Sequence, residues 1–430
     1  MSTTFAAHPV TAKDEWKKRW PLVLAAITGF SFHSIMTSFS GLFIGPIGEE
    51  FSWSRTQVTA GLSLGSILGT VLSPFFGVLI DRWGTRRLAL PGIVMKSLVL
   101  ASFAFMSHSV AHWMLMWIAY AVTSLFVKST IWTTAVAGVF TAGRGLAMGA
   151  VMSGTAIAQI LVPPLANWLI DNTGWRGAFA WLGLGWGSVA FVLCLLFLYD
   201  AHDDAKAAGV DAKVGNVELP GLTRAEAWRD SALWRIAIST FLIMVFTIAL
   251  TVHQIPILTE HGVSRTNAAW LASLAGASGI AGKLSTGFLI DRYRPNIVGG
   301  VILTGAFLGF MLLLPAFATP TLIVIAMLIN GFAAGTKLQI CAYMTSRYAG
   351  LKNFGTIFSI MASLIALASG LGPVLGGIVY DTTGSYTYFL IGGIICSIIS
   401  GSLIFGLKPY PIWETAPAPS AGTASSLQPT

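Results

Sequence analysis

Long apolar runs dominate this chain, and they restrict its fold more than any other feature. Of its 430 residues, 55% are apolar and only 10% are Asp, Glu, Lys or Arg, whereas a soluble domain carries about 25% charged residues. A helix that crosses a bilayer needs about 20 apolar residues, so the apolar content is enough for roughly twelve such helices. The composition excludes a water-soluble globule and predicts an all-α membrane protein.

Individual helices are placed by apolar stretches that end at charged residues or at Gly and Pro clusters. We expect twelve spans, over 20–45, 55–80, 87–107, 111–139, 145–170, 177–199, 233–258, 265–290, 296–316, 320–346, 354–380 and 385–408. The division of the chain follows: an N-terminal segment 1–19, a six-helix bundle 20–199, a connector 200–230, a second six-helix bundle 231–408 and a disordered tail 409–430.

Basic residues are distributed unequally between the two sets of predicted loops. Most of them fall on the side of the N-terminus and the connector, whereas the opposite loops hold Arg55, Arg176 and Arg265. Because Lys and Arg are enriched in cytoplasmic loops, we expect a multi-pass protein of the bacterial inner membrane with both termini in the cytoplasm. The net charge of +8 is then a topology signal, and no nucleic-acid partner is expected.

An internal repeat relates the two predicted bundles. Gly77-Val-Leu-Ile-Asp81-Arg82 recurs 210 residues later as Gly287-Phe-Leu-Ile-Asp291-Arg292. The same offset aligns further pairs: Gly145 with Gly355, Pro163 with Pro373, Asp171 with Asp381 and Gly174 with Gly384. A duplicated six-helix unit is typical of carriers that expose a central site to each side of the membrane in turn.

The loop after the second span resembles a known signature. Gly77-x-x-x-Asp81-Arg82-x-Gly84-x-Arg86-Arg87 is similar to the loop motif of the major facilitator superfamily, with a weaker copy at Gly287-x-x-x-Asp291-Arg292. Three stretches resemble its bacterial monocarboxylate-carrier and oxalate/formate-exchanger branch: Pro46 to Arg55, His253 to Ser264, and Gly282-Lys283-Leu-Ser-Thr-Gly287. The resemblance covers residues 15–408 and implies a two-bundle carrier of small carboxylates.

Charged residues of this signature are expected to govern exchange between conformations. Asp81 and Asp291 end their helices beside arginines, where ion pairs can hold the bundles in one state and break in the other. The alternative is a set of plain interfacial charges. The expected gating residues are Gly77, Asp81, Arg82, Gly84, Arg86, Asp291 and Arg292.

Lysines lie inside four predicted spans, whose interiors carry no carboxylate. They are Lys96, Lys128, Lys283 and Lys337. A lysine at the bilayer centre costs about 2.5–3.5 kcal/mol on insertion scales, so these groups should face an aqueous cavity. Their missing counter-charge indicates a negatively charged substrate.

The four lysines are not equivalent. Lys283 follows Gly276, Gly279 and Gly282, which should leave open space around it, and in the resembled branch a basic residue at this place grips a carboxylate. A structural or snorkelling role is the alternative. Lys128 and Lys337 occupy nearly equivalent repeat positions and should flank the cavity, whereas Lys96 is expected to pack or snorkel.

Other polar side chains inside the spans complete the expected substrate site. Histidine is the side chain whose unperturbed pKa lies closest to neutrality, and His33 and His253, by resemblance, lie on cavity-lining spans. Each either serves coupling or substrate binding or is a hydrogen-bonded core histidine. Gln254 adjoins His253 and the helix-bending Pro256. Trp132 follows Lys128 by one turn and either stacks on an organic substrate or packs in the core.

The sequence contains no nucleotide-binding loop, metal cluster or nucleophile elbow, so we expect neither an enzyme nor a cofactor. We predict a monomeric secondary transporter of small mono- or dicarboxylates, coupled to protons or to a counter-transported anion. The main alternative is a proton-coupled exporter of drugs or amphipathic compounds, which should have an apolar cavity with an acidic residue. A substrate-sensing membrane receptor is a weaker alternative.

Overall fold

The computed structural model describes residues 11–140, 144–199, 221–350 and 353–411. Its N-terminal half contains α1 (Ala12–Phe51), α2 (Arg55–Trp83), α3 (Thr85–Ser102), α4 (Val110–Leu125), α5 (Ser129–Val139), α6 (Arg144–Met152), α7 (Gly154–Trp181) and α8 (Gly187–Phe197). The C-terminal half contains α10 (Arg224–Arg229), α11 (Ser231–Glu260), α12 (Arg265–Arg292), α13 (Pro295–Met311), α14 (Pro320–Ala349), α15 (Phe354–Thr383) and α16 (Thr387–Phe405). The described chain is therefore helical nearly throughout.

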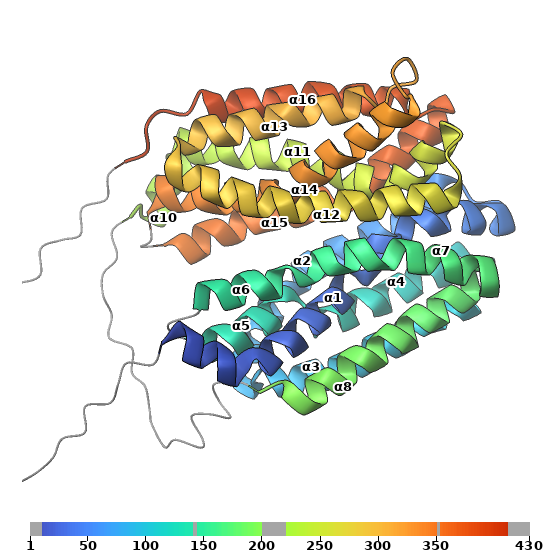
Figure 1. The fold of residues 1–430 in the computed structure, drawn as a ribbon, viewed down its shortest axis with the longest axis horizontal. Helices are drawn as coiled ribbons and strands as arrows, with labels where there is room; N and C mark the ends of the chain where they lie inside the picture. The colour runs from blue at the N-terminus through green and yellow to red at the C-terminus, as the bar shows by residue number, and fades with distance from the viewer. Residues whose placement is uncertain (1–10, 141–143, 200–220, 351–352, 412–430) are drawn as a thin grey trace, which may run out of the picture.

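The two halves form two layers of roughly parallel helix axes (Figure 1). We call the end that holds Ala12, α10 and Phe405 the tail side; it lies on the left in Figure 1. The opposite end, which holds Phe51, Arg55, Glu260 and Arg265, is the far side. The halves meet mainly where α2 packs on α15, α7 on α12 and α1 on α11.

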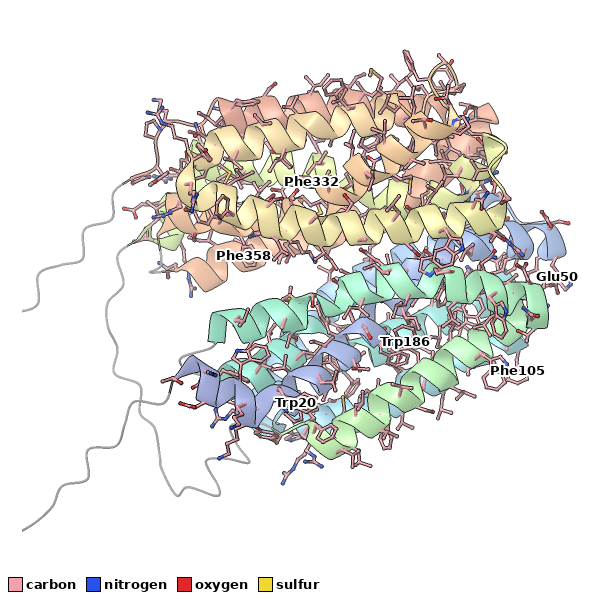
Figure 2. The ribbon with its side chains drawn as sticks, in the orientation of Figure 1. Trp20, Glu50, Phe105, Trp186, Phe332 and Phe358 are labelled. Atoms are coloured by element: carbon pink, nitrogen blue, oxygen red, sulfur yellow. The ribbon has the colours of Figure 1, made fainter. Side chains whose placement is uncertain are left out.

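The outer surface of the described helices is apolar. Eight helical segments are long and apolar enough to cross a membrane, and Leu115, Leu196 and Leu284 are 62%, 63% and 73% exposed. Side chains of this kind are usually buried in soluble proteins, and lipid is the solvent that suits them here. Figure 2 shows Trp20 and Glu50 at opposite ends of α1, whose 40 residues span about 60 Å.

The first helix is longer than the predicted span 20–45. Thr11 caps its N-terminus: the Thr11 hydroxyl accepts from the Asp14 backbone N–H, and the Asp14 carboxylate accepts from Thr11 in return. This capping box satisfies N–H groups that have no partner inside the helix. The helix therefore starts at Ala12, before the apolar run begins.

The single helix predicted over 111–139 is wrong, because the chain breaks between α4 and α5. Lys128 has an extended backbone (φ −69°, ψ 159°) and precedes the first residue of α5. The indole N–H of Trp132 donates to the Val127 carbonyl at 2.8 Å, so a side chain satisfies a carbonyl at the break.

Gly174, at φ +70°, bends α7 between the predicted spans 145–170 and 177–199.

Small residues bring α12 and α14 into close contact. Gly331 and Gly335 of α14 face Ala275 and Gly279 of α12, and a methyl group added at either α14 glycine would overlap the α12 backbone. Gly282 likewise lies against the Phe332 carbonyl. The expectation that Gly279 and Gly282 leave open space beside Lys283 is therefore wrong, because helix packing uses that space.

Replacement of Gly331 by Ala should destabilise the C-terminal half. The added methyl group meets the Ala275 carbonyl oxygen, and such overpacking costs about 1–3 kcal/mol of unfolding free energy. Gly305→Ala is the matched control, since a Cβ at Gly305 meets nothing within 4 Å. Thermal unfolding of the purified protein, followed by tryptophan fluorescence, should show a lower Tm for Gly331→Ala alone; equal Tm values would contradict this packing.

Candidate functional site

A cavity of about 270 Å³ lies between the two halves. Residues of α1, α2 and α4 form most of its wall, and Ala366 and Ser369 of α15 close it from the other half. Polar and aromatic side chains on the wall include His33, Thr37, Ser66, Thr70, Trp117, Tyr120, Ser124 and Lys128. We call this space the central cavity.

Lys128 reaches the wall of the central cavity because of the break between α4 and α5. The extended backbone at Lys128 interrupts the helix, and its side chain is half-buried. The prediction that Lys128 flanks a cavity between the bundles therefore agrees with its place in the structure. Trp132 does not join it: its ring is fully buried against Gly29, and its N–H is used at the break.

His33 lies on the same wall, on α1. Its ring stacks on Phe30, with 5.8 Å between ring centroids and 12° between ring planes. Its Nδ1 is buried and has no hydrogen-bond partner among the described residues. A buried polar atom without a partner is costly, and this one belongs to a residue on the wall of the central cavity.

Lys96 stands directly behind His33 and is packed there, which is one of the two roles expected of it. It is 0% exposed, so it does not snorkel. Its Nζ donates to the His33 carbonyl at 3.1 Å and lies 4.9 Å from the centroid of the Tyr120 ring. A second lysine amine therefore lies behind the wall of the central cavity. The sequence indicated it only as a lysine within an apolar span.

A smaller space of about 40 Å³ lies on the other side of α1, among α7, α11, α12 and α14. Gln254 is on its wall, together with Thr247, Thr251 and Asn330. Neither Oδ1 nor Nδ2 of Asn330 has a partner among the described residues. The Asn330 amide lies against Gly309 of α13, and Thr247, Thr251 and Gln254 are among the other polar residues of this wall.

Lys337 lies behind that smaller space. It is 7% exposed, and its Nζ donates to the hydroxyl of Thr247, which is on the wall. The neutral hydroxyl of Thr247 therefore lies between the Lys337 amine and the smaller space. Lys337 and Lys128 belong to opposite halves but adjoin different spaces, so they do not flank one cavity as their repeat positions predicted.

Lys283 is half-buried on α12 and is absent from the walls of both spaces described above. It follows Gly276, a wall residue of the smaller space that packs on Gln159 of the N-terminal half, by seven residues. Seven residues are nearly two helical turns, so Lys283 shares that face about 10 Å further along the helix. It lies toward the tail side of the site.

His253 has a different environment from the one expected of a substrate ligand. It is 0% exposed, with Nδ1 2.7 Å from the Tyr386 hydroxyl and Nε2 2.8 Å from the Pro373 carbonyl. The carbonyl can only accept, so Nε2 carries the proton and Nδ1 accepts from Tyr386. Both ring nitrogens are therefore occupied within the C-terminal half.

The expected gating residues lie at the tail side. The side chains of Gly77, Asp81, Arg82 and Asp291 fall outside the described part of the chain. Gly84 has φ +79° before α3, a backbone conformation that favours glycine. Arg86 donates to the Leu195 carbonyl at 2.9 Å, and Arg292 lies 4.0 Å from the centroid of the Phe288 ring, so both contact their own half.

Known proteins resemble the chain over most of its length. It is 25% identical to monocarboxylate transporter 13 of Rattus norvegicus over 392 residues, covering 90% of this chain and 88% of the relative. It is 26% identical to monocarboxylate transporter 11 of Homo sapiens over 405 residues, covering 90% and 82%. A bacterial homologue of the human lysosomal transporter Spinster superposes with a TM-score of 0.67 at 15% identity, over 90% of this chain and 95% of that one.

The sequence profile of the Major Facilitator Superfamily matches residues 24–336 and, overlapping them, 252–429. These matches cover both bundles and agree with the twelve-span architecture. The relatives are transporters and not enzymes. The chain belongs to the Major Facilitator Superfamily of membrane transporters.

Proposed function

We propose that this transporter carries small organic anions, either mono- or dicarboxylates, by exposing a central site alternately to the two sides of the membrane. One observation carries the proposal: the centre of the molecule holds lysines, and neither central space has Asp or Glu among its described wall residues. A positive, partly dehydrated site favours an anion. The printed names of the monocarboxylate relatives support the same substrate class.

The proposed binding groups lie at two levels. Lys128 would hold the anion in the central cavity, on whose wall His33 also lies, and Lys283 would contact it nearer the tail side. Lys96 and Lys337 donate to the neutral oxygens of His33 and Thr247. Both lysines would raise the positive electrostatic potential of the site without touching the substrate. Gln254 supplies an amide on the wall of the smaller space, where it can bind polar atoms of the substrate.

We further propose that the tail side faces the cytoplasm of a bacterium. Described basic residues such as Lys17, Arg229, Arg235 and Arg294 lie there, as cytoplasmic loops favour. Both termini would then be cytoplasmic, and the far side would face outward. The coupling partner would be a proton or a counter-transported anion.

A thermal-shift screen of the purified protein tests the substrate class directly. Lactate, pyruvate, oxalate and succinate represent the anions, and tetraphenylphosphonium represents the amphipathic cations that an exporter on this fold would bind. A ligand that binds the folded state raises Tm with concentration. A rise with one of the carboxylates supports the proposal, whereas a rise with the cation alone favours the exporter.

Lys128→Met and Lys283→Met should each weaken saturable uptake of the anion that the screen identifies. Loss of a hydrogen bond to a charged group costs about 1.5–3 kcal/mol, so KM should rise about tenfold or more in proteoliposome uptake. Lys17→Met is the matched control, because Lys17 is exposed on the tail side. Wild-type kinetics in both site variants, with folding intact, would contradict the assignment.

Replacement of Lys96 by Met tests whether this residue contributes through its charge or through its packing. Methionine preserves most of the side-chain volume, and replacing a buried charge by an apolar residue is often neutral or stabilising. We expect an unchanged or higher Tm together with about a threefold higher KM for the anion, a modest effect typical of partly screened charges. A lower Tm with unchanged KM would show that Lys96 serves the fold alone.

A further inference from the structure

An apolar groove lies on the C-terminal half at the tail side, where α10, α11 and α15 meet. Apolar side chains such as Trp234, Ile357 and Ile360 form its wall, and Arg224 is the one charged residue on the described part of that wall. The groove shares no described wall residue with the central cavity or with the smaller space. We call it the tail-side groove, and it is distinct from the proposed substrate site.

The face of α15 that borders the groove is the face that meets lipid. Ile360, on the wall, is 40% exposed, and Leu371 and Ile378 are 44% and 45% exposed. Steps of 11 and 18 residues return an α-helix to within about 20° of the same direction, so these three side chains share one face. Leu371 and Ile378 belong to the apolar segment Ile360–Thr383, where large exposed apolar side chains suit hydrocarbon.

The central cavity lies on the opposite face of the same helix. Ser369, which helps to close that cavity, follows Ile360 by nine residues. Nine residues are two and a half helical turns, so the two side chains point in opposite directions. The tail-side groove therefore opens toward the membrane and away from the central cavity.

Backbone contacts hold α10 at the tail-side end of the groove (Figure 1). The Leu222 N–H donates to the Ala349 carbonyl at 2.8 Å, and the Asn353 side-chain amide donates to the Leu222 carbonyl at 2.9 Å. Ala349 ends α14 and Asn353 precedes α15. The short helix is thus fixed to the ends of two membrane helices, and its side chains have defined places on the wall.

Two tryptophans of the wall mark the level of the lipid headgroups. Trp228 and Trp234 are 60% and 42% exposed, and the Trp234 indole N–H donates to the Trp228 carbonyl at 2.9 Å. Exposed tryptophans of membrane proteins are enriched at the boundary between lipid and water. From this level the wall continues along α15 from Ile357 to Leu364, a distance of about 10 Å toward the membrane interior.

Positive charge lies at the tail-side end of the groove. Arg224 and Arg229 of α10 are both exposed. The two acidic residues of 221–230 are used at helix starts: Glu226 accepts from Thr223 at 2.8 Å, and Asp230 accepts a first-turn N–H of α11 at 2.9 Å. Because a guanidinium matches the geometry of a phosphate group, Arg224 is suited to contact a phosphate at this end.

We propose that the tail-side groove binds an anionic phospholipid of the surrounding membrane. One acyl chain lies between α11 and α15, and the headgroup phosphate contacts Arg224. Burial of the chain against the apolar wall supplies affinity, and the arginine favours a negatively charged headgroup over a neutral one. The site goes beyond the proposed function and is independent of the compound that is carried.

Photolabelling of the full chain in lipid nanodiscs tests the site. The bilayer is phosphatidylcholine with a small share of a probe lipid, either phosphatidylglycerol or phosphatidylcholine, that carries a diazirine on one acyl chain. Mass spectrometry of the digested protein identifies the peptides that gain each probe. We expect adducts on the α15 peptide that contains Ile357 and Leu364, about fivefold more of them from the anionic probe. Equal labelling by the two probes would overturn the preference for an anionic lipid.

Arg224→Gln should lower the ratio of anionic to neutral adducts at the groove about fivefold, as expected for loss of one cation near a lipid surface. Arg229→Gln is the matched control. It removes the same charge from the same short helix, but Arg229 is five residues away, about 140° around the helix, and is not on the described wall. A ratio that is unchanged in Arg224→Gln, or that falls equally in the control, would contradict the phosphate contact.

Ile360→Trp should fill the groove and remove the adducts of both probes there. Ile378→Trp is its control, because Ile378 lies on the same exposed face of α15 but is not on the described wall, and its groove adducts should remain. Circular dichroism during heating checks that each variant is folded. Persistent adducts in Ile360→Trp, or no groove adducts in the parent because another segment or a second copy covers the groove, would overturn the site.

Discussion

Positive charge in an apolar bundle is the constraint on which the rest of this molecule depends. Lys96 and Lys337 are almost completely buried, and their printed partners are neutral oxygen atoms. Charges within a membrane span are costly unless they face a cavity or a partner. Lysines from α3 and from the break between α4 and α5 lie near the imidazole of His33 on α1, and of these two Lys128 reaches the wall of the central cavity.

The two halves differ in their central charged residues but share the contacts that join them. The central charges are unequally divided, since Lys128, Lys96 and His33 surround the larger cavity, and Gln254 and Lys337 adjoin the smaller one. The far-side contacts, by contrast, keep the repeat: Arg265 meets Asp171, and the first turn of α2 meets Asp381. The central polar and charged residues therefore differ between the halves, while the contacts that join the halves keep the repeat.

Sequence reasoning found the architecture because its signals are local. Apolar length placed the spans, and the repeat divided them into two bundles. Sequence reasoning failed where the hydrogen-bond partner of a side chain decides its role. Trp132 satisfies a carbonyl at an unpredicted break, and His253 is held by Tyr386 and Pro373. Gly279 and Gly282 were misassigned for the same reason, because an approaching helix has no signature in their own segment.

The sequence by itself determined the membrane class, the twelve spans and the presence of lysines within apolar spans, since apolar length and charge content are properties of single segments. Only the tertiary structure decided which cations adjoin a cavity, which histidine keeps a free nitrogen and which aspartate caps a helix of the other half. These depend on distances between residues far apart in the chain. Helix packing sets those distances, and hydropathy along one segment carries no information about them.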